Sequence, residues 1–237
     1  MTTRRLLPLL GLGLTEVVHQ RVLRVCVVAG LALLLVAASL RDLSFGLDQV
    51  RFVSEAASAL ACFFATVQSI FLAGLLLGDQ PARARAALVI TRGVPRVDWY
   101  LSRAAPVLAA CWVMVMAVHV TATVVAPATM MGSASLVTDL MRVSLTTAFA
   151  VASAVMCENA ILAASLALAL TVASLLLPLV RASAPGTPAQ VGWSILAVLV
   201  PSFPDGEGLS PSGIAYGMAR IGVVFAAGAA AFSRREL

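Results

Sequence analysis

The sequence contains no lysine, and all sixteen of its basic residues are arginine. A nucleotide-binding P-loop of the Walker A type needs a lysine at the β- and γ-phosphates. The chain therefore cannot carry a standard motif of that kind, and any nucleotide that drives its work must bind to another chain. The arginines flank apolar runs, so we attribute them to membrane topology and expect no nucleic-acid partner.

Charge of either sign is scarce. Charged residues make up 11% of the 237 residues and hydrophobic residues 61%, whereas a soluble domain carries about 25% charge. Apolar runs long enough to span a bilayer, with no charge or a single one, occur repeatedly along the chain. A soluble all-helical protein with a very apolar core is the alternative, and the recurrence of these runs disfavours it.

The sequence also lacks the clusters on which catalysis and metal binding depend. Its four cysteines lie in or at the edge of apolar runs, with no two close in sequence, and are interpreted as small buried hydrophobes: Cys26, Cys62, Cys111 and Cys157. No catalytic triad, paired carboxylates or metal-ligand spacing is present. We expect neither an enzyme nor a cofactor or metal on this chain.

The apolar runs predict an all-α integral membrane protein, because lipid leaves unpaired backbone groups without partners. The single domain, 1–237, is expected to contain six transmembrane helices at 22–40, 56–78, 104–126, 138–157, 160–180 and 212–232. The fourth and fifth would form a hairpin with its turn at Cys157, Glu158 and Asn159. Continuous runs of this length do not fit the alternating strands of a β-barrel.

Two further segments are too short or too polar to cross. Residues 5–20 predict an amphipathic interfacial helix, with Leu10, Leu14, Val17 and Val18 on one face and polar residues, Glu16 among them, on the other. The outer segment before the last span contains "VGWSILAVLV", which predicts a re-entrant or interfacial helix.

The distribution of arginine predicts the orientation. Eleven arginines fall on one side: Arg4, Arg5, Arg21, Arg24, Arg83, Arg85, Arg92, Arg96, Arg103, Arg234 and Arg235. Four fall on the other: Arg41, Arg51, Arg142 and Arg181. Both termini are therefore expected in the cytoplasm.

The largest cytoplasmic loop of this arrangement runs from Asp79 to Arg103 and contains "TRGVPRVDWYLSR". Together with an amphipathic N-terminal helix, six spans and the tail "FSRREL", it resembles the type-2 permeases of ATP-binding-cassette (ABC) transporters. The family shows an Arg-Pro-Val-Ser-Arg-x-Glu-Tyr-like run in this loop. The segment "LTEVVHQRVLRV" is similar to the family's N-terminal helix, with Glu16 at its acidic position.

The loop departs from the family at several positions. Gly93 replaces the usual proline and Pro95 the usual serine. A Glu-x-Gly-Thr-like run is expected just upstream, where this chain has Ala82, Ala84 and Arg85. A degenerate partner in a heteromeric transporter would show such changes.

The resemblance implies a short coupling helix in this loop that docks on a separate ATPase subunit, where ATP and Mg²⁺ bind. The residues it assigns to docking are Arg92, Val94, Arg96, Asp98, Trp99, Tyr100 and Arg103. Glu158, at the hairpin turn, is expected to face cytoplasmic water, and a second contact with the ATPase is the alternative. Arginine and aromatic residues are typical of interface hot spots. Alternatively, the arginines only set topology and the aromatic pair belongs to an interfacial belt.

Two polar residues inside predicted spans are candidates for a substrate path. Arg220 lies in the last span and either faces the cavity, snorkels to headgroups or pairs with an outer acid such as Asp139. His119 lies in the third span. With no acid near it in the sequence, it is expected to be a hydrogen-bonded packing residue rather than a proton relay or metal ligand.

The resemblance therefore implies the permease subunit of an ATP-driven exporter in the bacterial cytoplasmic membrane. Its expected partners are the ATPase, a second permease copy or paralogue, and lipid. A non-transporting membrane scaffold in a larger complex is the alternative. An ion-coupled carrier is poorly supported, because the sequence shows no internal repeat.

Overall fold

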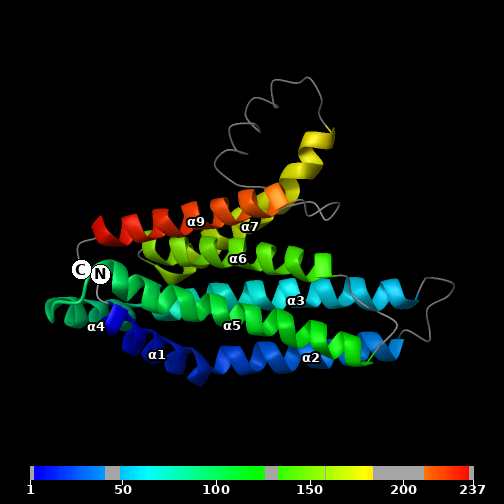
Figure 1. Ribbon diagram of the computed structural model, residues 1–237, viewed down its shortest axis with the longest axis horizontal. Helices are drawn as coiled ribbons and strands as arrows, with labels where there is room; N and C mark the ends of the chain where they lie inside the picture. The colour runs from blue at the N-terminus through cyan, green and yellow to red at the C-terminus, as the bar shows by residue number, and fades with distance from the viewer. Residues whose placement is uncertain (1–2, 41–48, 126–132, 158, 184–210, 235–237) are drawn as a thin grey trace.

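The chain folds into a bundle of long helices that run roughly along one axis (Figure 1). The computed structural model describes residues 3–40, 49–125, 133–157, 159–183 and 211–234, and every element in these ranges is helical. The long helices are α2 (Arg21–Leu40), α3 (Gln49–Ala73), α5 (Arg96–Val125), α6 (Ser133–Met156), α7 (Ala160–Ser183) and α9 (Pro211–Arg234). The all-α class predicted from the sequence is confirmed for these residues.

Five helical segments of the described residues are long and apolar enough to cross a membrane. They are Arg21–Ser39, Phe52–Gly78, Arg96–Val125, Ser135–Met156 and Pro211–Arg234. The chain is thus a multi-pass membrane protein by the length and composition of its helices. Helix α7, which is not among these five, has 24 residues, and its part Ala160–Ala173 is apolar. The re-entrant segment expected before the last span lies outside the described residues, as does Glu158.

Helix α6 is the centre of the bundle. It packs against α3, α5, α7 and α9, and 83% of its candidate span is buried inside the chain. Its inner face is built from small residues and from hydroxyls that bond back to the helix backbone. Thr147 Oγ1, for example, donates to the carbonyl of Val143 at 2.7 Å. Such internal bonds let polar side chains stay in an apolar interior without an unpaired donor.

Helix α1 (Thr3–His19) packs along the first half of α5. Gly13 makes this approach possible, because a Cβ at that position would collide with the carbonyl oxygen of Ser102. Pro106, one turn further along α5, has no N–H for that carbonyl. The two backbones therefore meet where α5 has a gap in its own hydrogen-bond ladder.

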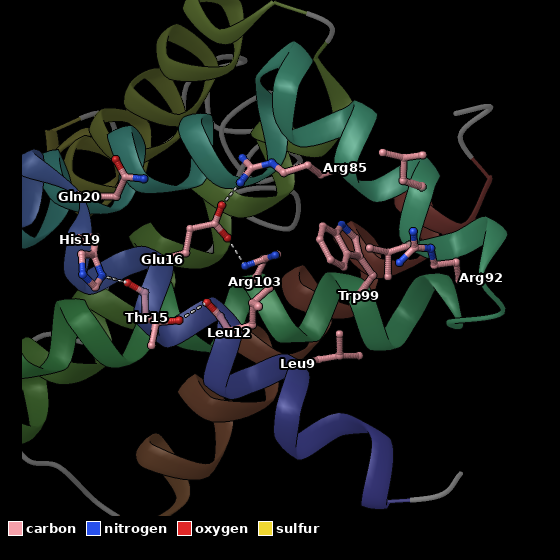
Figure 2. A pocket seen from close by; sticks show the side chains of 12 residues that line it. Leu9, Leu12, Thr15, Glu16, His19, Gln20, Arg85, Arg92, Trp99 and Arg103 are labelled. Atoms are coloured by element: carbon pink, nitrogen blue, oxygen red, sulfur yellow. Dashed lines mark hydrogen bonds and ion pairs between the residues drawn. The ribbon is translucent and has the colours of Figure 1, made fainter.

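The face of α1 that packs inward differs from the predicted one. Val17 is buried as expected, but Leu14 and Val18 are about half exposed. Glu16 lies on the packed side, facing α4 and α5 (Figure 2). An interfacial helix with this orientation presents leucine and valine to the outside and one carboxylate to the bundle.

A short helix, α4 (Gln80–Thr91), connects the second and third long helices. It follows a π-helical end of α3, Gly74–Gly78, in which the amide of Asp79 donates to the carbonyl of Gly74 at 2.9 Å. Helix α4 ends at Thr91, and Gly93, two residues later, has a φ of +82°, the left-handed conformation common after a helix C-terminus. Pro95 then precedes α5. The glycine and proline that depart from the family run are thus the residues that make this turn.

Candidate functional site

The end of the bundle that carries α4 is also where α1 begins and α9 ends (Figure 1). A groove of about 860 Å³ opens there between α1, α4 and α5. It is lined by Leu9, Leu12, Thr15, Glu16, His19, Gln20, Arg85, Leu88, Val89, Arg92, Trp99 and Arg103. The lining thus combines leucines with three arginines and one carboxylate.

A carboxylate shared by two arginines organises the groove. Figure 2 shows Glu16 of α1 between Arg85 of α4 and Arg103 of α5, with one carboxylate oxygen on each guanidinium. The side chain of Arg103 is 3% exposed and that of Glu16 18%, whereas that of Arg85 is 48% exposed. The buried pair, Arg103 with Glu16, joins α5 to α1, and the more exposed pair, Arg85 with Glu16, joins α4 to α1.

Trp99 forms the wall of the groove behind the triad. The guanidinium of Arg103 lies over the Trp99 ring, 4.3 Å from its centroid. This is cation–π geometry, which becomes stronger where water is excluded. Arg103 is therefore held by a carboxylate and by a ring face, and both contacts are internal to the chain.

The segment "TRGVPRVDWYLSR" divides into a surface part and a buried part. Arg92 and Val94 lie in the turn between α4 and α5, exposed and half-buried respectively. Asp98, Trp99, Tyr100 and Arg103 lie in the first two turns of α5 and are 7%, 3%, 0% and 2% exposed. The sequence placed these four in a cytoplasmic loop; in the structure they are buried, because α5 begins at Arg96 and its first turns are packed inside the bundle.

Tyr100 and Asp98, the other two buried residues of this segment, also have structural roles. Tyr100 Oη donates to the carbonyl of Phe225 in α9 at 3.2 Å, and its ring lies 6.1 Å from that of Phe232. Gly228 gives it room, since a Cβ there would contact the hydroxyl. Asp98 lies in the first turn of α5, where a carboxylate stabilises the positive end of the helix dipole.

Arg96, half-buried, connects two helix ends. Its Nη1 donates to the carbonyl of Ser233, near the last residue of α9, at 2.8 Å. Similarly, Arg83 Nη2 donates to the carbonyl of Cys157 between α6 and α7 at 3.0 Å. These two arginines therefore hold the arginine-rich end of the bundle together, besides any role in topology.

A second polar cluster lies inside the bundle, towards the opposite end. Asp139 of α6 is 1% exposed and accepts hydrogen bonds from Ser58 Oγ at 2.9 Å and Cys62 Sγ at 3.4 Å, both on α3. His119 Nε2 of α5 is 3.4 Å from the other carboxylate oxygen. One carboxylate thus joins the three helices at the core.

The sequence-based view of His119 as a residue without a nearby acid is wrong. Its acid is twenty positions away in sequence and on another helix, so local sequence could not reveal it. The expectation of hydrogen bonding is confirmed, since Nδ1 bonds the carbonyl of Val115 at 3.0 Å. Among the described residues, no group of three or more histidine, cysteine or acidic side chains is arranged to hold a metal ion.

Arg220 lies on the outer part of α9. Its guanidinium stacks on Tyr216, 3.9 Å from the ring centroid, and Nη2 donates to the Tyr216 hydroxyl. Tyr216 is one turn towards the start of the helix, so the Arg220 side chain extends towards the end of α9 that begins at Pro211. Snorkelling of Arg220 to headgroups at that end stays a prediction. Asp139, a partner considered from the sequence, accepts hydrogen bonds from Ser58 and Cys62 and lies beside His119 instead. The other outer acids, Asp205 and Glu207, lie outside the described residues.

Replacing Asp139 tests whether this cluster stabilises the bundle. Asp139→Asn keeps an oxygen that accepts from Ser58, so we expect nearly wild-type thermal stability in detergent. Asp139→Leu removes both oxygens and should lower the free energy of unfolding by about 1–2 kcal/mol. Equal stability of the two variants in thermal denaturation would show that the hydrogen bonds contribute nothing.

Comparison with known proteins adds no assignment. No protein-family model matches the chain, and a search of curated proteins gives no match either. The function must therefore be argued from the helices and the groove.

Proposed function

We propose that the chain is the permease subunit of an ATP-driven ABC-type exporter. In this proposal it crosses the membrane six times, with α7 as the fifth span and both termini in the cytoplasm of a bacterium. A separate ATPase subunit binds ATP and Mg²⁺, and a second permease copy or paralogue completes the transporter. The chain itself carries out no chemistry.

The observation that supports this proposal best is α4. It is a separate twelve-residue helix between the second and third long helices, and it carries Arg83 and Arg85 at the end of the bundle where α1 begins and α9 ends. A loop that only reversed the chain direction would need a few residues. This one has its own helix, a fixed glycine turn, and ties to α1 and to the turn between α6 and α7.

A rigid, anchored helix of this kind can transmit force. A push on α4 or on the turn after it acts on α1 through Arg85 and Glu16, and on α6 and α7 through Arg83. The π-helical end of α3 provides a place where the helix can repack, since such insertions often occur at functional sites. Closure of an ATPase beneath α4 would thereby reach most helices of the bundle.

The alternative, a non-transporting scaffold, agrees with the well-packed interior. The intramembrane polar groups described here lie close to one another, as His119 and Asp139 do, or bond to neighbouring side chains, as Arg220 does. A scaffold needs no substrate path and would use the same arginine-rich end to bind its partners. The two functions differ in whether the partner hydrolyses ATP.

Two experiments test the proposal: identification of the partner subunit, and substitutions in the turn between α4 and α5. The tagged chain, purified from its native host in mild detergent, should bring down a stoichiometric subunit with a P-loop. Arg92→Glu and Val94→Asp, made separately, should each reduce recovery of that subunit at least tenfold, because changing a hot-spot residue of an interface costs about 1–2 kcal/mol or more. Arg96 is unsuitable for this test, since its bond to Ser233 makes it part of the fold.

Arg234→Glu is the matched control. It makes the same charge change at an exposed arginine at the same end of the bundle, on α9 rather than in the α4–α5 turn. Recovery of the ATPase should be unchanged. Equal loss in the control would indicate a general charge effect, and a large assembly without any P-loop subunit would favour the scaffold.

A further inference from the structure

We propose that the groove between α1, α4 and α5 binds an anionic phospholipid from the leaflet at the arginine-rich end. The inference rests on the membrane orientation proposed above. It depends neither on transport nor on an ATPase, because the site is formed by this chain alone.

The first argument is charge. The lining holds three arginines, Arg85, Arg92 and Arg103, and one carboxylate, Glu16. Glu16 is shared by Arg85 and Arg103, which leaves a net positive lining. Arg92 forms no ion pair with any residue that the structure describes, and the Arg85 side chain is half exposed. A phosphate diester in the groove would supply the missing negative charge and accept hydrogen bonds from both.

The second argument is the apolar part of the same lining. Leu12 and Leu88 line the groove and are 55% and 63% exposed. Val89 and Trp99 add further apolar surface to the same lining. Large exposed leucines beside arginines suit a ligand with a phosphate at one end and a hydrocarbon chain at the other. A nucleotide or sugar phosphate would leave the leucines in water.

The third argument is position. Helix α1 ends at His19 and α2, the first span, begins at Arg21, so Gln20 and His19 bring the groove to the start of a span. Basic pockets between helices at the cytoplasmic side of a membrane bind anionic lipid headgroups. The groove volume of about 860 Å³ falls within the range of about 300–1,000 Å³ for small-molecule sites. That space accommodates a headgroup and the first part of its acyl chains.

Trp99 offers a direct readout, because it lines the groove and bromine on an acyl chain quenches tryptophan at short range. The other tryptophans, Trp112 and Trp193, are replaced by phenylalanine in the full chain. The protein is reconstituted in phosphatidylcholine vesicles with a small fraction of brominated phosphatidylglycerol, or the same fraction of brominated phosphatidylcholine. Quenching should be stronger with the anionic lipid.

Arg92→Gln should reduce the preference for phosphatidylglycerol about fivefold, the effect of one arginine near a charged lipid surface. Arg234→Gln, an exposed arginine at the same end but outside the groove, should keep it. Equal quenching by the two lipids, or an unchanged preference in Arg92→Gln, would overturn the proposal. Displacement of the lipid by millimolar inorganic phosphate would show that the groove recognises a free anion instead.

A second measurement covers the chance that the single-tryptophan chain misfolds. Native mass spectrometry of the unmodified chain should show a retained phosphatidylglycerol whose occupancy falls in Arg92→Gln. Val94→Asp separates this proposal from the ATPase docking, because Val94 does not line the groove. That variant should lose the ATPase and keep the lipid preference, so failure of one proposal leaves the other testable.

Discussion

Glu16→Gln should lower the free energy of unfolding by about 3 kcal/mol, at the low end of the cost of breaking a buried ion pair. The glutamine has the same shape but no charge. It would leave the guanidinium of Arg103, whose side chain is 3% exposed, against Trp99 without a counter-ion. The carboxylate is 18% exposed, and water reaching it limits the loss. Thermal denaturation of the purified protein in detergent measures the change.

A double variant distinguishes a lost ion pair from a lost shape. Glu16→Gln combined with Arg103→Met removes both charges, and replacing a buried pair by apolar groups is often close to neutral. We therefore expect the double variant to recover most of the stability lost by Glu16→Gln alone. Glu55→Gln, at an exposed acid of α3, is the control and should change little. Stability of Glu16→Gln equal to wild type would mean that Arg103 finds another partner.

The helical class and most span limits could be predicted because they depend on composition and run length. The predicted span 22–40 compares with α2 at Arg21–Leu40, and the predicted turn at Cys157–Asn159 lies between α6 and α7. Asn159 is the N-cap of α7, since its Oδ1 accepts a hydrogen bond from the amide of Ile161 at 2.8 Å. These features are local, and sequence shows them directly.

The length of α5 could not be predicted from charge. The sequence placed the third span at 104–126 because Arg103 and Asp98 looked like residues of a loop. In the structure both are buried in α5: Glu16 of α1 pairs with Arg103, and Asp98 lies at the positive end of the α5 helix dipole. A charged residue marks the end of a span only when no favourable electrostatic contact compensates its charge inside the bundle. The partner of Arg103 was almost ninety positions away in sequence.

The cluster around Asp139 escaped prediction for a related reason. Ser58 and Cys62 are one turn apart on α3, and a serine and a cysteine in an apolar helix usually only pack or bond back to the backbone. Their common acceptor lies on α6, and His119 lies on α5. Three helices had to be brought together before any of these residues could be seen as a site. An acid near the start of the fourth span was the one signal available.

The second large effect is expected for Gly13→Val. The Cβ alone would collide with the carbonyl oxygen of Ser102, and it would lie 3.0 Å from Cγ of Pro106. A backbone carbonyl and a proline ring cannot rotate away as a flexible side chain can. We expect α1 to be displaced from α5 and the protein to lose about 3 kcal/mol of stability, the upper end of the cost of overpacking.

Displacement of α1 has a consequence that simple overpacking would not have. Glu16 is one turn further along α1, so its distance to Arg85 and Arg103 would increase, and the groove would lose one wall. Limited proteolysis at the N-terminal segment should become faster in Gly13→Val than in wild type. Gly11→Val on the same helix is the matched control, because a Cβ at Gly11 meets nothing within 4 Å.

The position of α1 depends on both the glycine contact and the ion pair. Combining Gly13→Val with Glu16→Gln should therefore cost less stability than the sum of the two single changes, because the pair is already broken once α1 has moved. Strictly additive losses would show that α1 stays docked in Gly13→Val and that the strain is absorbed within α5.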